Sequence, residues 1–314
     1  MSNNPKISVI MNCYNSAKYL KEAINSVYAQ TFHDWEIIFW DNASTDDSPN
    51  IVRAYDDKIS YFRSGQTTSL GEARNLAIGK ARGEFIAFLD CDDKWLPDKL
   101  QKQVDIFTRS PETTFIYTNY YLFNEESKKT KVIHKKECPR GNIFEQALFA
   151  YQVGLLTVMV KKSALDKLET LFDVNLNLAE EYDVFMRLFY NAKVEYLHEP
   201  LAVYRVHSEM STLKHNDKFS DERLYCLEKF KKIDRSVGMR YKDALNNIEA
   251  KIRYNKGLVE LEKTAMLLKE YRFKTPYAFC VYLLSRSYLF VNFMCTRINN
   301  IITGSAYFNS RKIK

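Results

Sequence analysis

Short apolar runs alternate with segments of helical periodicity over the first hundred residues, and this alternation limits the fold more than any other feature. The apolar runs are predicted to be strands: Ile7–Met11, Trp35–Trp40, Ile59–Phe62 and Glu84–Leu89. Helices are predicted between them, the first opening at the good N-cap residues Asn15 and Ser16 and others near Pro49 and over Gly71–Ala81. This βαβα order predicts an α/β fold with a doubly wound, mostly parallel, Rossmann-like sheet.

Polar residues follow three of these strands, at the point where each strand ends. They occupy Asn12–Asn15, Asp41-Asn42 and Asp90–Asp93. Ligands of open α/β sheets bind outside the carboxyl ends of the strands. The sequence therefore predicts a ligand site at that edge.

The run Asp90-Cys91-Asp92-Asp93 places three carboxylates within four residues. Like charges so close oppose each other's ionisation unless a cation neutralises them. Mg²⁺ and Mn²⁺ favour oxygen ligands, and Mg²⁺ often bridges carboxylates to substrate phosphates. The run thus indicates a divalent ion holding a diphosphate; the alternative is a solvated turn with helix-capping acids.

Several common site motifs are missing from the sequence. An EF-hand loop is excluded because Lys94 and Trp95 stand where an acid or Asn and a glycine belong. No GxxxxGK[ST], GxGxxG, GxSxG or HExxH run occurs. These absences argue against P-loop hydrolases, dinucleotide-dependent dehydrogenases, serine hydrolases of the nucleophile-elbow type and zinc proteases.

Composition favours a packed intracellular protein. Hydrophobic residues make up 46% of the chain and charged residues 27%, a balance that supports a core rather than disorder. The six cysteines form no CxxC pair, so reduced thiols are expected. The opening residues lack the features of a secretory signal. A cytoplasmic location is predicted.

The chain changes character twice after residue 110. Between 115 and 207 the pattern is mixed, with an exposed loop or hairpin expected over Glu125–Glu137, a strand over Val153–Val160 and a helix over Glu180–Asn191. Beyond His215 it turns to long, charged helical segments. The division predicted is a catalytic domain over 1–215 and a helical extension over 216–314.

Three runs, ISVIMNCYN, FHDWEIIFWDNASTDDS and GEARNLAIGKARGEFIAFLDCDD, closely resemble glycosyltransferase family 2, inverting enzymes of GT-A fold found in bacterial surface-glycan synthesis. The match covers roughly residues 6 to 210. The resemblance implies metal-assisted transfer of a sugar from a nucleotide-diphosphate donor, most often a UDP-sugar, to a hydroxyl of a glycan or lipid-linked acceptor. Mn²⁺ or Mg²⁺ is the implied cofactor.

The resemblance also implies roles for individual residues. Nucleotide contacts fall to Asn12, Cys13, Tyr14, Asn15, Asp41, Arg74 and Asp90. Asp92 and His207, the latter in the run YRVH, would hold the metal and the diphosphate. Gly154, Thr157 and Trp95 would lie on the acceptor side.

The run AEEYDVFMRL resembles the family's acidic motif, whose second acid is the catalytic base, here Glu181. Family members usually carry Asp at this position. The departure leaves Glu180 and Asp183 as alternatives. A base opposite the leaving group gives inversion, as in inverting glycosidases.

The basic charge is concentrated at the end of the chain. Residues 271–314 hold seven Lys or Arg and no Asp or Glu, and elsewhere 39 basic residues balance 39 acidic ones. A nucleic-acid binder more often spreads basic charge over a folded face, so none is expected as a partner. The apolar run 277–302 is interrupted by Arg286 and Arg297 and is too broken to span a bilayer.

Two interpretations of this tail stay open. It would either bind an anionic membrane surface, placing the protein on the inner face of the cell membrane, or pack on the catalytic domain or in a homodimer interface. A different class of function also stays open: a non-catalytic nucleotide-sugar-binding or membrane scaffold protein of the same fold.

Overall fold

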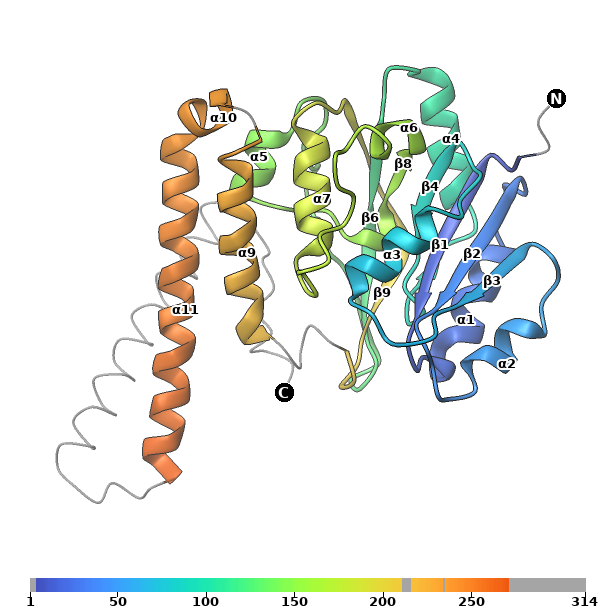
Figure 1. Ribbon diagram of the computed structural model, residues 1–314, viewed down its shortest axis with the longest axis horizontal. Helices are drawn as coiled ribbons and strands as arrows, with labels where there is room; N and C mark the ends of the chain where they lie inside the picture. Colours follow the sequence, from blue (N-terminus) through green and yellow to red (C-terminus); the bar gives the residue numbers. More distant parts are fainter. Residues whose placement is uncertain (1–3, 211–215, 234, 271–314) are drawn as a thin grey trace. The chain divides into compact units, whose positions relative to one another are not determined.

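The computed structural model describes residues 4–210, 216–233 and 235–270 (Figure 1). The chain divides into two compact units, Met1–Ser211 and Thr212–Lys314, and each is considered by itself. The tail 271–314, to which the membrane and dimer expectations refer, lies outside the described residues.

The first half of unit 1 is a parallel sheet. Its strands lie side by side in the order β3-β2-β1-β4, with Ile7 of β1 level with Trp35 of β2 and Phe85 of β4. The elements are β1 (Ile7–Cys13), α1 (Ala17–Tyr28), β2 (Trp35–Asp41), α2 (Ser48–Arg53), β3 (Ile59–Arg63), α3 (Leu70–Ile78) and β4 (Phe85–Phe88). The predicted alternation is therefore confirmed.

The second half makes the sheet mixed rather than mostly parallel. The order continues β4-β8-β6-β9-β5, in which only β6 and β9 pair in parallel, and β7 pairs with β6. These strands are β5 (Lys94–Trp95), β6 (Phe115–Asn124), β7 (Lys129–Val132), β8 (Met159–Lys161) and β9 (Val194–Val206). The turn of the β6–β7 hairpin and the exposed strand β7 lie within the stretch Glu125–Glu137 expected to be an exposed loop or hairpin, whereas β6 precedes it and is mostly buried.

The helical elements of this half are α4 (Lys99–Arg109), α5 (Phe144–Phe149), the 3₁₀ turn η1 (Leu155–Thr157), α6 (Lys162–Leu165) and α7 (Glu180–Phe189). The strand predicted over Val153–Val160 is therefore wrong in its first part. Residues 155–157 form the turn η1, and the strand begins only at Met159.

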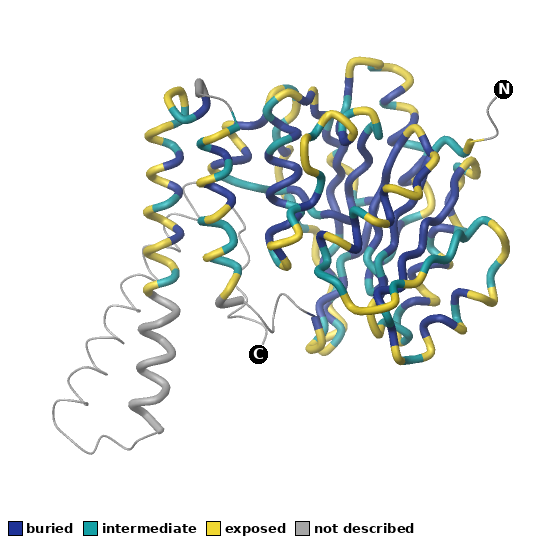
Figure 2. Tube along the Cα trace, viewed as in Figure 1, coloured by how far each residue is buried: buried dark blue, intermediate teal, exposed yellow. Residues whose placement is uncertain are grey.

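The core lies on both sides of the parallel strands. All seven residues of β2 are buried, and successive side chains of a strand point to opposite faces, so both faces are covered (Figure 2). The four residues that α1 buries, Leu20, Ala23, Ile24 and Val27, stand at the predicted helical spacing. Burial of Leu20, Ile24 or Val27 stabilises the fold by about 1.5–3 kcal/mol each, and burial of the smaller Ala23 by less.

The N-terminus of α1 differs from the sequence expectation. Ser16 occupies the N-cap position, but its hydroxyl donates to the carbonyl of Tyr14 instead of capping the helix. The cap is distant in sequence: Oδ2 of Asp46 accepts from the backbone N–H of Ala17 at 2.9 Å. The loop after β2 is thereby tied to the loop after β1.

Unit 2 is helical where it is described. It contains α9 (Asn216–Phe230), α10 (Arg235–Arg240) and α11 (Lys242–Glu270). α9 and α11 lie side by side (Figure 1), and Lys256 of α11 pairs with Asp221 of α9. Within the described ranges no helix has the length and apolar content needed to cross a membrane.

Candidate active site

The polar ends of β1, β2 and β4 meet at one edge of the sheet. The thiol of Cys91, after β4, donates to the carbonyl of Asn12 at 3.2 Å, and the N–H of Asn42, after β2, donates to the carbonyl of Cys13 at 2.8 Å. The order of parallel strands brings these segments together, because their carboxyl ends share one edge. Here the structure places the expected nucleotide-binding residues.

Asp41 organises the loop after β2. Its side chain is fully buried, with Oδ1 accepting from the N–H of Ser44 at 2.7 Å. Oδ2 accepts from Tyr61 at 2.6 Å and from the guanidinium of Arg63 at 2.9 Å. Protein groups thus donate to both carboxylate oxygens of Asp41. The direct hydrogen bond expected between Asp41 and a nucleobase remains a proposal.

The residues between β1 and α1 differ in what they present. The ring of Tyr14 is 53% exposed and free to meet a flat ligand. Asn15 has a left-handed backbone, φ 51°, and its Oδ1 accepts from the N–H of Thr45 at 2.8 Å. The thiol of Cys13 faces the core and is 1% exposed, so the expected side-chain contact from Cys13 to the nucleotide is not supported.

Arg74 lies between two acids and not on the surface. Its guanidinium, 3% exposed, donates to Oδ1 of Asp90 at 3.2 Å and to Oε1 of Glu180. The ring of Phe172 lies 5.5 Å from its Cζ. Burial raises the pKa of Asp90, and Arg74 opposes that rise. Arg74 therefore holds α3, the acidic turn and the start of α7 together, and the implied contact with the nucleotide would have to pass through Asp90.

Glu181 has the electrostatics of a general base. Burial raises its pKa to about 8, and the neighbouring Glu180 adds to the rise. Arg74 and a hydrogen bond from the backbone of Leu155 lower it. Oε2 of Glu180 is buried and has no partner among the described residues. A carboxyl with a pKa near neutrality is suited to accept a proton from a hydroxyl.

Asp183 lies in a different environment from Glu181. It is fully buried, and its Oδ2 accepts from Arg187 at 2.7 Å, one turn further along α7. Arg187 also donates to the carbonyls of Thr170 and Leu171. Asp183 therefore fixes the loop before α7, and the structure does not support it as the alternative base.

Asp92 and His207 face each other across 115 residues of sequence, with Nε2 of His207 3.0 Å from Oδ2 of Asp92. The Asp92 side chain is 33% exposed, whereas the imidazole is largely buried beside Tyr19. The other imidazole nitrogen, Nδ1, is buried without a partner among the described residues.

This pair fits a divalent ion that takes its remaining ligands from substrate. Among residues 4–210, 216–233 and 235–270 no group of three or more His, Cys, Asp or Glu side chains is arranged to hold a metal alone. Mg²⁺ is usually bound by one or two protein ligands plus phosphate oxygens and water. Asp92 supplies a carboxylate of that kind, and His207 adds an imidazole nitrogen beside it.

Arg205 is a residue that the sequence did not single out for a role. Its N–H donates to Oδ1 of Asp93 at 2.8 Å, and its Nε donates to the carbonyl of Asp92 at 2.8 Å. Burial raises the pKa of Asp93 well above its usual value. Arg205 thus holds the acidic turn against β9. Its position two residues before His207 was the feature of the sequence that could have identified it.

Two of the residues expected on the acceptor side, Gly154 and Thr157, form a compact turn. Oγ1 of Thr157 donates to the carbonyl of Gly154 at 2.7 Å. A Cβ at Gly154 would lie 3.2 Å from Leu156 and 3.4 Å from Tyr120, so glycine suits this close approach. Trp95 is 3% exposed and donates from Nε1 to the carbonyl of Leu156 at 2.8 Å. Trp95 supports the turn from inside, contrary to the expected contact with the acceptor.

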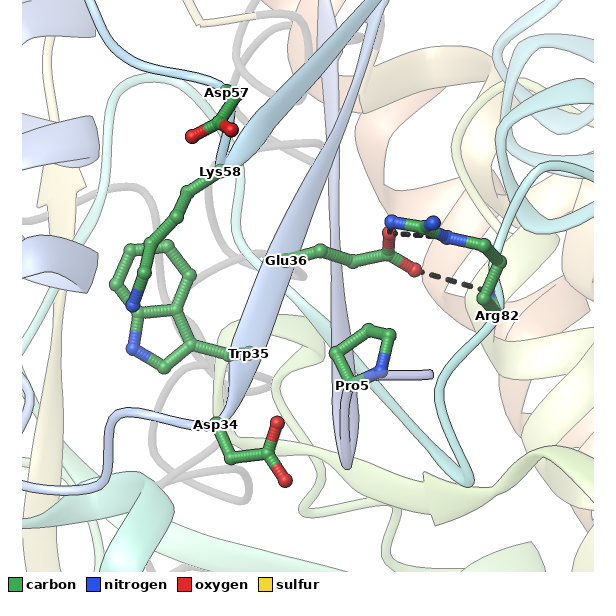
Figure 3. Close-up of a pocket in the computed structure, with 7 residues that line it drawn as sticks. All are labelled: Pro5, Asp34, Trp35, Glu36, Asp57, Lys58 and Arg82. Atoms are coloured by element: carbon green, nitrogen blue, oxygen red, sulfur yellow. Dashed lines mark hydrogen bonds and ion pairs between the residues drawn. The ribbon is translucent and has the colours of Figure 1, made fainter. Parts of the chain in front are cut away.

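A shallow cavity of about 250 Å³ lies at the other end of the parallel strands (Figure 3). It is lined by Pro5, Asp34, Trp35, Glu36, Asp57, Lys58 and Arg82. These residues precede or begin β1 to β4, whereas the candidate site residues follow those strands. Glu36 points towards Arg82, which binds it through Nε at 2.9 Å. The cavity contains none of the candidate residues.

Solved structures with the same fold define the class. The chain matches TarS of S. aureus in complex with UDP at a TM-score of 0.63 and 18% identity, over 96% of this chain and 93% of that one. It matches the mannosyltransferase PcManGT of Pyrobaculum calidifontis, in complex with GDP-Man and Mn²⁺, at 0.60 and 16%, over 92% and 86%. The protein has the GT-A fold, as predicted.

Sequence comparison gives the family. The model for Glycosyl transferase family 2 matches residues 8–166. The chain is 31% identical over 207 residues to the putative teichuronic acid biosynthesis glycosyltransferase TuaG of Bacillus subtilis, over 64% of this chain and 79% of TuaG. It is 30% identical over 161 residues to the UDP-Glc:alpha-D-GlcNAc-diphosphoundecaprenol beta-1,3-glucosyltransferase WfgD of Escherichia coli, over 51% and 62%. The chain belongs to glycosyl transferase family 2 and is a nucleotide-sugar-dependent glycosyltransferase.

Proposed function

We propose that this enzyme transfers a sugar from a UDP-sugar to a hydroxyl of a glycan or lipid-linked acceptor, with inversion at the anomeric carbon. The observation that best supports the proposal is the electrostatic environment of Glu181. Its pKa is raised to about 8 by burial and by Glu180, and Asp90 at the acidic turn contributes to the same rise. The base and the phosphate end of the site therefore form one electrostatic cluster.

The charge balance of this cluster explains the need for a cation. Asp90, Glu180 and Glu181 surround the single guanidinium of Arg74, and Asp92 lies two residues from Asp90. A diphosphate would add further negative charge. Asp92 and His207 would hold Mn²⁺ or Mg²⁺, and the bound ion supplies positive charge to the departing diphosphate.

The protein's own groups carry the remaining steps. Tyr14 and the loop held by Asp41 would receive the base, and the turn 154–157 would form the acceptor wall next to Glu181. Glu181 would accept the proton of the attacking hydroxyl on the side opposite the leaving group, so one displacement inverts the configuration. UDP is favoured as the nucleotide because the TarS structure is a complex with UDP and WfgD is a UDP-Glc-dependent glucosyltransferase. A lipid-linked acceptor is favoured because the acceptor of WfgD is alpha-D-GlcNAc-diphosphoundecaprenol.

A donor screen tests the proposal. The purified protein is incubated with UDP-glucose, UDP-N-acetylglucosamine or UDP-galactose and Mn²⁺, with and without a panel of octyl glycosides as acceptors. Release of UDP without acceptor and faster release with one acceptor are expected. Binding of UDP with no hydrolysis or transfer from any donor would instead favour the non-catalytic nucleotide-sugar binder.

A further inference from the structure

Helix α4 buries two polar side chains beneath the acceptor-side turn. Lys99 and Gln103 are each 0% exposed. Nζ of Lys99 donates to Oε1 of Gln103 at 2.9 Å, and Nε2 of Gln103 donates to the carbonyl of Thr157 at 2.9 Å. Burial also lowers the pKa of Lys99 well below its usual value. Because burying such groups is costly unless they are bonded, their presence under the turn calls for a reason.

The chemistry of the two side chains fixes one orientation. Nζ of Lys99 donates to Gln103, and an amide has one accepting and one donating end. Lys99 therefore selects the oxygen of Gln103, and the nitrogen is turned towards Thr157. Nζ of Lys99 also lies 4.0 Å from the ring of Trp95, whose Nε1 donates to the carbonyl of Leu156. Two successive carbonyls of η1 are thus held by buried donors.

The 3₁₀ turn η1 also contacts the candidate base, Glu181. The backbone of Leu155 is hydrogen-bonded to the carboxylate of Glu181, and Thr157 closes the turn through the carbonyl of Gly154. A shift of η1 would move both the acceptor wall and a hydrogen-bond donor of Glu181. Misplacement of reacting groups by about 1 Å can lower a rate by roughly 10²-fold.

We propose that Lys99 and Gln103 are positioning residues for the acceptor half of sugar transfer, acting through η1 on the acceptor wall and on Glu181. The inference rests on the proposed function and assigns to α4 a part in that reaction. Neither side chain would touch donor or acceptor.

The test compares transfer with donor hydrolysis, using the donor and octyl glycoside that react with the wild type. Gln103→Leu removes the donor to Thr157 and preserves an apolar volume. We expect the ratio of transfer to hydrolysis to fall about tenfold, because water can adjust its position whereas an acceptor depends on the wall. The acceptor KM should rise more than the donor KM.

A matched control lies on the same helix. Gln101 donates to Asp105 at the surface, so Gln101→Leu removes an amide of the same size without affecting η1. Its ratio should equal that of the wild type. Lys99→Met, which removes the group that orients Gln103, should lower the ratio in the same direction as Gln103→Leu. If neither variant folds, Trp95→Phe, which removes the donor to Leu156 and retains a ring, gives the same readout.

The outcomes separate the two proposals. An unchanged ratio in folded Gln103→Leu and Lys99→Met, or an equal fall of transfer and hydrolysis, would overturn the positioning role and leave the proposed function intact. Absence of transfer by the wild type with every donor would contradict the proposed function and this inference with it.

Discussion

Nε2 of His207 lies 3.0 Å from Oδ2 of Asp92, so the end of β9 and the acidic turn after β4 present one nitrogen and one oxygen at the same point. We expect UDP to bind more tightly in the presence of Mn²⁺ or Mg²⁺, and Asp92→Ala to abolish this dependence. Calorimetry with and without metal measures it. Asp105→Ala, which removes an exposed acid of α4, is the control and should retain the wild-type metal dependence. Equal UDP affinity of the wild type with and without metal would contradict the proposed diphosphate site.

Replacement of Glu181 by Gln should separate binding from turnover. The amide retains the shape and the hydrogen bond from Leu155 but cannot accept a proton. UDP affinity should therefore change little, whereas transfer should fall by roughly 10²-fold or more. Steady-state kinetics and calorimetry on the same preparation measure both. Transfer near the wild-type rate would mean that another group is the base, and Glu180 would be examined next.

The pH dependence of kcat/KM should report the same carboxyl. Glu181 must be ionised to act, and its pKa in the free enzyme is raised to about 8. Activity is therefore expected to rise with pH through about 8 and then level off. In Glu181→Gln the residual activity should lack this rise. A wild-type profile that is flat between pH 6 and 9 would show that no such group controls the reaction.

Removal of the guanidinium between Asp90 and Glu180 should destabilise unit 1. Arg74→Met retains the length of the side chain but leaves the buried Glu180 without its counter-ion. Breaking a buried ion pair on one side costs about 3–5 kcal/mol, which chemical denaturation can measure. The double variant Arg74→Met with Glu180→Gln should regain part of this loss, since it removes the uncompensated charge. Additive effects of the two changes would indicate that the pair is not coupled.

The basic tail supplies a prediction based on sequence alone. Replacement of all seven Lys and Arg beyond Glu270 by Gln should weaken recovery of the protein on vesicles of phosphatidylcholine and phosphatidylglycerol. Each basic residue near an anionic surface contributes about 1 kcal/mol, less at high salt. Wild-type binding should accordingly decline as salt rises. Equal flotation of wild type and variant would favour packing on the protein or a homodimer.

The first hundred residues were predictable because their information is local. Apolar runs and helical spacing mark β1 to β4 and their helices, and parallel order then places residues 12, 41 and 90 at one edge. The turn η1 was mistaken for strand because a short apolar run does not distinguish the two. The strands β6 and β9 of the sheet were not predicted because their polar and apolar residues follow no single period.

The side-chain partners in the site could not be read from sequence in the same way. Arg74 meets Glu180 across 106 residues, and Asp46 caps a helix that Ser16 was expected to cap. Asp183 and Glu181 look equivalent in the run EEYDV. Only the packing of α7 shows that one is fixed by Arg187 while the other adjoins η1.

Strand β5 has two residues, and its partner in the sheet is β9, with Lys94 level with Val203. During synthesis on the ribosome, β1 to β4 can therefore pair before β9 has been made. The acidic turn then still lacks Arg205 and His207, which bind it from β9 and the residue after it. At typical translation speeds the delay between Trp95 and Val203 is about 5–20 s. A nascent chain arrested before β9 would carry the strands of the proposed nucleotide site, but Asp92 would not yet have His207 beside it.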